Sequence, residues 1–130
     1  MDGKVALVTG GTRGIGAATT RLLVAAGWRV AANYRSDEAG AAALKAELGK
    51  AVRLFRADVS EEKAIVRLFD DALCHYGRLD GLVNNAGVTA PTVPMRRGGR
   101  AGEVAEAIVW LLSDAASFCT GSLLDVSGGR

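Results

Sequence analysis

The chain has 130 residues, of which 49% are hydrophobic and 23% charged, so its composition is that of one ordinary folded domain and not of a disordered or fibrous segment. Its 16 basic and 14 acidic side chains are spread along the sequence and leave a formal charge of +2, which gives no reason to expect nucleic acid or an anionic membrane as a partner. No apolar run approaches membrane-spanning length.

The first residues run directly into a strand-like segment, without the apolar stretch of a secretory signal, so we expect a cytoplasmic protein. The cysteine content agrees with this expectation. Cys74 and Cys119 are too few to form a disulfide framework, which favours a reducing compartment.

A strand and a helix open the chain. Lys4–Thr9 is a near-continuous apolar run closed by glycines, which is typical of a strand buried on both faces. Gly14–Ala26 follows with apolar residues at helical spacing, and Gly27 stands where the end of a helix favours glycine. The same alternation continues, with strands predicted at Arg29–Asn33, Val52–Ala57 and Leu79–Asn84, and helices at Asp37–Leu48 and at Ser60–His75, where Ser60 is the predicted cap.

This alternation predicts a parallel sheet with right-handed crossovers. After Gly87 the pattern changes, because residues 88–101 hold both prolines and three arginines without any period and are expected to form a loop. A helix at Glu103–Ser113 and a strand at Ser122–Val126 complete the predicted elements.

We therefore predict one α/β domain over residues 1–130, a Rossmann-type doubly wound parallel sheet of about five strands between two layers of helices. A right-handed crossover through the last helix would place the final strand beside the fourth, in the order 3-2-1-4-5. The alternative is that the tail docks poorly and leaves an exposed sheet edge prone to association.

The segment Thr9–Gly16, with the sequence TGGTRGIG, leaves the first strand and opens the first helix. Its amides and the helix dipole converge beyond the end of the strand, where anions bind. Gly10 suits a tight turn, Gly14 lets the backbone approach a phosphate, and Gly16 lets the helix pack against the strand. Alone these glycines could be no more than a turn, but in a βαβ unit they predict a site for the pyrophosphate of a dinucleotide.

The end of the second strand bears on the choice of dinucleotide. An acidic residue about 20 positions after the glycines holds the ribose 2′-hydroxyl of NAD. Here the strand ends in Asn33-Tyr34-Arg35-Ser36, and Arg35 can pair instead with a 2′-phosphate, with Arg13 approaching from the loop. We therefore expect NADP(H) in preference to NAD(H). The alternative is that Arg35 is only a solvated turn residue.

The third and fourth strands end in Asp58-Val59 and in Asn84-Asn85-Ala86-Gly87, and these residues are expected at the same edge of the sheet as the glycine loop. Ligands bind at this edge in doubly wound folds. Taken singly, Asp58 could also be only a turn or helix-capping residue.

The segments TGGTRGIG, NYRS, ADVS and NNAG, in this order and spacing, resemble the short-chain dehydrogenase/reductase family, and the tail from Pro94 to Gly129 resembles the C-terminal end of the same family. The resemblance implies a cofactor-binding half at residues 1–87, a loop at 88–101, and a C-terminal helix and strand at 102–130 that could form a homo-oligomer contact. It also implies, with Asp58 at the adenine ring, a cofactor site made of Gly10, Thr12, Arg13, Gly14, Ile15, Gly16, Arg35, Ser36, Asp58, Val59, Asn85, Ala86 and Gly87.

The family transfers hydride with a serine and a Tyr-x-x-x-Lys pair, and this sequence lacks that pair. Four residues after Tyr34 is Glu38, and four residues after Tyr76 is Asp80. Val88–Val93 stands where the family carries the segment with these catalytic residues, so the chain resembles an internally truncated member. We expect it to bind NADP(H) with little or no hydride transfer alone. The alternative is an incomplete version of an active NADP-dependent carbonyl or 3-oxoacyl-type reductase, or of a sugar or alcohol dehydrogenase.

Other groups give weaker signals. His75 is expected at the surface and not as a base, and Arg96, Arg97 and Arg100 are expected to be solvated and not a nucleic-acid patch. A methyl-donor cofactor would favour an acidic residue where Arg35 stands. The sequence predicts no metal site and names no substrate.

Overall fold

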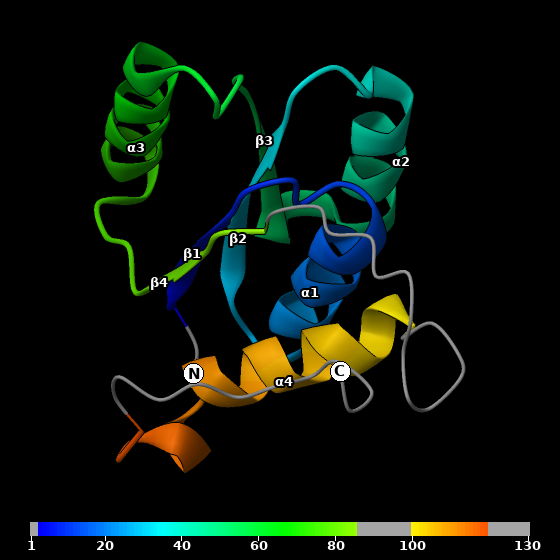
Figure 1. Ribbon diagram of the computed structural model, residues 1–130, viewed down its shortest axis with the longest axis vertical. Helices are drawn as coiled ribbons and strands as arrows, with labels where there is room; N and C mark the ends of the chain where they lie inside the picture. The colour runs from blue at the N-terminus through cyan, green and yellow to red at the C-terminus, as the bar shows by residue number, and fades with distance from the viewer. Residues whose placement is uncertain (1–2, 86–99, 120–130) are drawn as a thin grey trace.

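A computed structural model describes residues 3–85 and 100–119 of the chain (Figure 1). Four parallel strands form the sheet in the order β3-β2-β1-β4, as the sequence predicts for the first four. The predicted fifth strand at Ser122–Val126 lies outside the described residues. The strands are β1 (Val5–Val8), β2 (Arg29–Tyr34), β3 (Val52–Arg56) and β4 (Gly81–Val83).

Helices connect and follow the strands, and their bounds differ from the predicted ones by at most two residues. Short 3₁₀ turns stand at Gly49–Ala51 and Asp114–Ala116. The α-helices are α1 (Gly14–Ala25), α2 (Glu38–Leu48), α3 (Glu62–Tyr76) and α4 (Ala101–Leu112).

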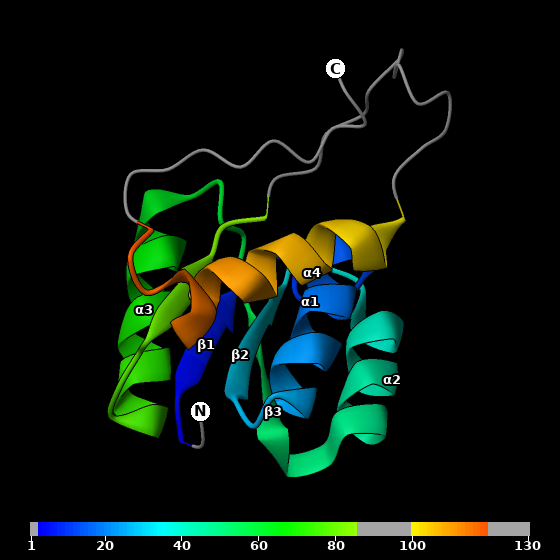
Figure 2. The same cartoon turned by 90° about the horizontal axis from the view of Figure 1, so that it is seen from below.

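The sheet is covered on both faces, which explains the unbroken apolar run of its central strand. All four residues of β1 have no exposed surface. Ala6 and Val8 pack with Leu23 of α1 on one face, while Leu7 packs with Leu68 of α3 on the other. Figure 2 shows α3 on one side of the strands and α1 and α2 on the other. The predicted doubly wound α/β architecture is confirmed.

The last helix lies against α1 and not where the predicted crossover would place it. A right-handed crossover from β4 to a strand beside it would put the helix on the face that carries α3. Instead Ile108 and Leu112 of α4 join the core on the α1 face, and α4 crosses α1 in both ribbon views (Figures 1 and 2). Gly81 allows this docking, because a Cβ there would stand 3.1 Å from a methyl carbon of Leu112.

The start of α3 corrects a second prediction. Ser60 does not cap the helix, whose N-cap is Glu61 without a side-chain hydrogen bond. The Ser60 amide and hydroxyl both donate to Oδ1 of Asp58, at 3.0 and 2.6 Å. A local turn of this kind competes with capping for the same serine.

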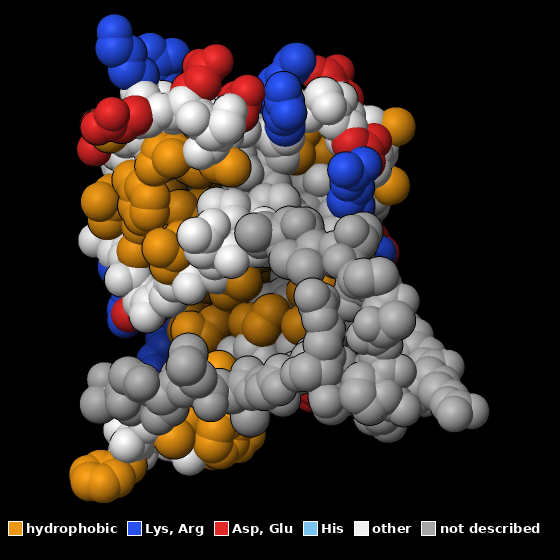
Figure 3. Space-filling view, in the orientation of Figure 1, with side chains coloured by type: hydrophobic (Ala, Val, Ile, Leu, Met, Phe, Trp, Pro, Cys, Tyr) orange, Lys and Arg blue, Asp and Glu red, His pale blue; other side chains and the backbone are white. Residues whose placement is uncertain are grey.

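Apolar side chains are exposed on the α3 side of the sheet and on α4, among other places. On the α3 side Val66 and Leu73 of the helix and Leu82 of β4 are about half exposed, and Figure 3 shows apolar atoms gathered over α3. On α4, Trp110 and Leu111 are also exposed, so an oligomer contact through this helix stays a prediction. Within residues 3–85 and 100–119 no helix is long and apolar enough to cross a membrane.

Candidate functional site

The carboxyl ends of the four strands bring the described site residues to one edge of the sheet. The glycine loop follows β1, Arg35 and Ser36 follow β2, Asp58 and Val59 follow β3, and Asn85 follows β4 by two residues. Because all four strands are parallel, these segments share an edge although they come from separate parts of the sequence. Ala86 and Gly87, the remaining predicted site residues, lie outside the described residues.

The glycines of the loop have the conformations and contacts that the sequence suggests. Gly10 and Gly14 adopt φ values of 59° and 58°, in the left-handed region that side chains disfavour. At Gly16 a Cβ would stand only 1.9 Å from the carbonyl oxygen of Gly10. The first turn of α1 therefore rests directly on the backbone of the turn that leaves β1.

The N-terminus of α1 is suited to an anion. Its N-cap, Arg13, makes no side-chain capping bond, and the first turn of the helix holds no acidic residue. At Gly14 no heavy atom lies within 4 Å of where a Cβ would stand, so the backbone is open to a close approach. Helix amides and the positive end of the dipole favour phosphate at such a position. These residues fit a dinucleotide pyrophosphate.

Thr9 joins this loop to the end of β4. Its buried hydroxyl oxygen accepts a hydrogen bond from the Asn85 amide at 2.9 Å, and the hydroxyl lies 3.3 Å from the Val83 carbonyl oxygen. The Asn85 side chain in turn reaches the carbonyl of Gly10 at 3.5 Å. Asn85 is thereby fixed next to the glycine turn.

Arg35 and Asp58 form an ion pair across the ends of β2 and β3. Arg35 Nε lies 3.5 Å from Asp58 Oδ2, and the arginine side chain is 76% exposed. Hydrogen bonds from the hydroxyl and amide of Ser60, assisted by the charge of Arg35, hold the pKa of Asp58 below its ordinary value. Asp58 is thus a turn residue, as the alternative suggested, and also a fixed negative charge beside Arg35.

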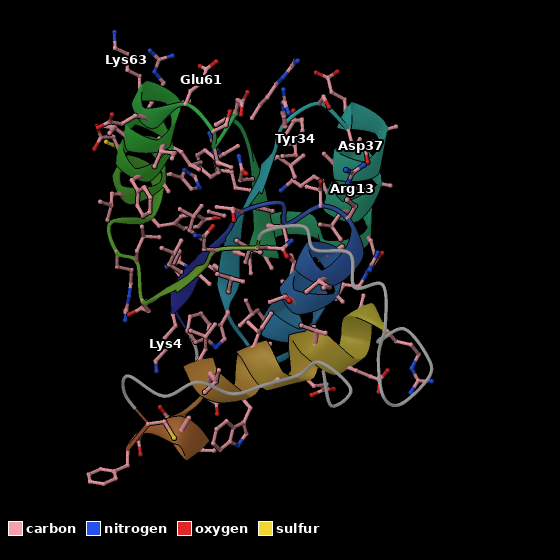
Figure 4. All side chains as sticks on the ribbon, in the orientation of Figure 1. Lys4, Arg13, Tyr34, Asp37, Glu61 and Lys63 are labelled. Atoms are coloured by element: carbon pink, nitrogen blue, oxygen red, sulfur yellow. The ribbon has the colours of Figure 1, made fainter. Side chains whose placement is uncertain are left out.

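A second arginine approaches the same region from the loop. Arg13 is the N-cap of α1, and Asp37, which caps α2 just after Ser36, appears in the same part of the view in Figure 4. Arg13 is exposed, as Arg35 is. Two exposed cations therefore follow β1 and β2 at the carboxyl edge of the sheet.

Neither tyrosine begins a Tyr-x-x-x-Lys arrangement. Tyr76 ends α3, which runs back from the carboxyl edge, and its hydroxyl donates to the Val30 carbonyl near the start of β2 at 3.3 Å. Burial raises the pKa of Tyr76. Tyr34 closes β2 and is followed by no lysine at the family's spacing. Within the described ranges no group of acidic, histidine and cysteine residues could hold a metal ion.

Sequence reasoning missed Asn33 and Thr9 as buried polar side chains beneath the loop. Asn33 and Thr9 are 2% and 7% exposed, and each makes several hydrogen bonds at the carboxyl edge. The signal was present, since each is a polar residue at the end of an otherwise apolar strand. A buried polar group of this kind requires partners.

A separate groove of about 480 Å³ lies between α1 and α4. It is lined by Ala18, Arg21 and Leu22 of α1 and, among others, by Arg100 next to α4. Both arginines are already paired, Arg21 with Glu47 at 2.7 Å and Arg100 with Glu103 at 3.4 Å. None of the predicted cofactor residues lines it.

The fold and the edge just described define a dinucleotide-binding α/β domain. A family model described as short chain dehydrogenase matches residues 4–107, and one described as Enoyl-(Acyl carrier protein) reductase matches residues 89–130. The chain belongs to the short-chain dehydrogenase/reductase family, whose members are oxidoreductases that bind a nicotinamide dinucleotide.

Relatives and one solved structure agree with this family. The chain is 48% identical over 94 residues to elsinochrome reductase 1 of Elsinoe fawcettii, which covers 69% of this chain and 35% of that protein. It is 49% identical over 86 residues to an acetoacetyl-CoA reductase of Shinella zoogloeoides, and this match covers 66% of this chain and 35% of that protein. The solved structure of a Serratia marcescens short-chain dehydrogenase/reductase mutant superposes with a TM-score of 0.64 and 37% identity. The superposition covers 75% of this chain and 41% of that one. The chain spans about a third of the length of the curated relatives it matches.

We predict that Gly16→Ala destabilises the fold. The added Cβ would overlap the Gly10 carbonyl, so the free energy of unfolding should fall by about 1–3 kcal/mol or more. Gly102→Ala is the matched control, because nothing lies within 4 Å of its Cβ position and alanine favours the helix by about 0.5–1 kcal/mol. Urea unfolding followed by circular dichroism measures both. Equal stability of Gly16→Ala and the native chain would contradict the tight contact.

Proposed function

We propose that the chain is an NADP(H)-binding member of this family, with the pyrophosphate at the N-terminus of α1 and the 2′-phosphate at Arg35 and Arg13. The observation that carries the proposal is the exposed guanidinium of Arg35 at the end of β2. A carboxylate at this place would accept the ribose hydroxyl of NAD, whereas a guanidinium attracts phosphate with charge-assisted hydrogen bonds.

In this proposal each predicted residue has a defined part. The amides at Gly14 and Ile15 face the pyrophosphate, and Thr12 and Gly16 support the same turn. Ser36 extends the 2′-phosphate site beside Arg35. Asp58 and Val59 lie beside the adenine ring, and Asn85 extends the site from the end of β4. The bound cofactor supplies hydride chemistry, while these residues bind and orient it.

The cofactor preference gives a direct test. Fluorescence titration should show saturable binding of NADPH, tighter than NADH by about tenfold to a hundredfold, since a charge-assisted bond contributes about 1.5–3 kcal/mol. Arg35→Asp should remove or reverse this preference, because it replaces the cation with a carboxylate. Arg67→Ala, an exposed arginine on α3, is the control and should bind as the native chain does. An unchanged preference in Arg35→Asp would contradict the assignment.

We propose further that the chain transfers little or no hydride alone. Reduction of a carbonyl needs a proton at the developing alkoxide, and a positioned general acid supplies it. Tyr76 is committed to the Val30 carbonyl, and neither tyrosine begins the family's Tyr-x-x-x-Lys pair. NADPH absorbance should therefore stay flat when carbonyl compounds are added to protein of verified intact mass. Carbonyl-dependent oxidation that disappears in Arg35→Asp would overturn this part.

The alternative is a part of an active reductase whose remaining groups come from elsewhere. It is favoured by the coverage of the relatives, because the matched segments account for only 35% of an acetoacetyl-CoA reductase and 38% of a 2,5-dichloro-2,5-cyclohexadiene-1,4-diol dehydrogenase of Sphingobium indicum. If this alternative holds, NADPH oxidation should appear when a separately produced C-terminal portion of such a relative is added to the chain. The cofactor site proposed here is the same in both.

A further inference from the structure

Asn33 occupies a buried position beneath the glycine loop and is 2% exposed. It is the next-to-last residue of β2 and pairs in register with Phe55 of β3. Its side-chain oxygen accepts from the Gly10 amide at 3.3 Å, and its backbone carbonyl accepts from the Gly11 amide at 2.9 Å. Its side-chain nitrogen donates to the carbonyls of Phe55 and Ala57, at 3.2 and 3.1 Å.

This set of partners requires a carboxamide. The loop side offers an N–H donor, whereas the β3 side offers two carbonyl acceptors, so the side chain must accept on one side and donate twice on the other. Turning the amide over would place N–H against N–H and oxygen against two oxygens. An aspartate of the same size would keep the bond from Gly10 but would lose both donors and bury a charge against two carbonyls.

The bonds of Asn33 join three segments of the proposed cofactor site. Gly10 and Gly11 begin the pyrophosphate loop, Arg35 stands two residues after Asn33, and Ala57 directly precedes Asp58. Asn33 accepts hydrogen bonds from the amides of Gly10 and Gly11, which lie between the end of β1 and the start of α1.

We propose that Asn33 is a positioning residue that fixes the distance between the pyrophosphate loop and the 2′-phosphate site. This inference rests on the proposed function. It predicts that Asn33 contributes to binding of the whole dinucleotide, which must touch both sites at once, and not to binding of a fragment that touches one. When two binding sites are held at the right separation, a ligand that reaches both binds far more tightly than a fragment that reaches only one.

The test compares NADPH with adenosine 2′-monophosphate, a fragment that reaches the 2′-phosphate site without the pyrophosphate loop. In Asn33→Asp and Asn33→Ser, the Kd of NADPH should rise by about tenfold or more, since several hydrogen bonds are lost or left unmade. The Kd of the fragment should change by less than about twofold. Equal weakening of both ligands, or weakening of neither, would overturn the positioning role.

Tyr76→Phe is the matched control, because it removes one hydrogen bond to the opposite end of β2, at the Val30 carbonyl. It should leave the Kd of both ligands unchanged, which separates the positioning effect from general loosening of the strand. An effect of Tyr76→Phe equal to that of Asn33→Ser would contradict a role specific to Asn33.

A measurement on the native chain keeps the proposal testable if the variants fail to fold. The side-chain amide protons of Asn33 should exchange slowly with solvent, and NADPH should slow them further. Exchange as fast as that of an exposed amide would overturn the proposal. Absence of NADPH binding by the native chain would instead refute the proposed function, while the exchange rate would still report on the hydrogen bonds of Asn33.

Discussion

The contact between Gly16 and the carbonyl of Gly10 sets the position of the first turn of α1 at the carboxyl edge. With no side chain between them, the first turn of α1 lies on the turn that leaves β1, and the amides of the helix start over the end of the sheet. The position of α1 then determines where α4 docks, since Ile108 and Leu112 pack into the same core as Leu23. One missing Cβ thus links the proposed anion site to the packing of a helix some ninety residues later in the chain.

At this edge the buried polar side chains are neutral and the charged side chains are accessible to solvent. Beneath the loop the polar groups are neutral, with Asn33 and Thr9 satisfied by backbone and amide partners. Beyond the strand ends the groups are ionised and solvated, as the pair of Arg35 and Asp58 illustrates. Buried neutral groups hold shape without the cost of desolvating a charge, while exposed ions keep their freedom to meet a charged ligand.

The sequence alone predicts those features that depend on a local residue pattern. The apolar run of β1, the glycines of the loop and the positions of Arg35 and Asp58 follow from periodicity and from the order of βαβ units. The placement of α4 was not predictable in the same way, because its apolar stripe suits either face and only the surface offered by α1, Trp28 and Gly81 decides between them. The roles of Asn33 and Ser60 depend on partners in other strands or turns, which spacing alone does not reveal.

Among the described residues α4 therefore closes the α1 face of the sheet, while Leu82 and the side of α3 remain uncovered. The central claim is that the carboxyl edge binds NADP(H), and amide chemical shifts recorded by NMR during a titration with NADPH test it most directly. The account predicts saturable shifts at the glycine loop, at Arg35 and at Asp58. No saturable shifts, or shifts confined to the groove between α1 and α4, would contradict it.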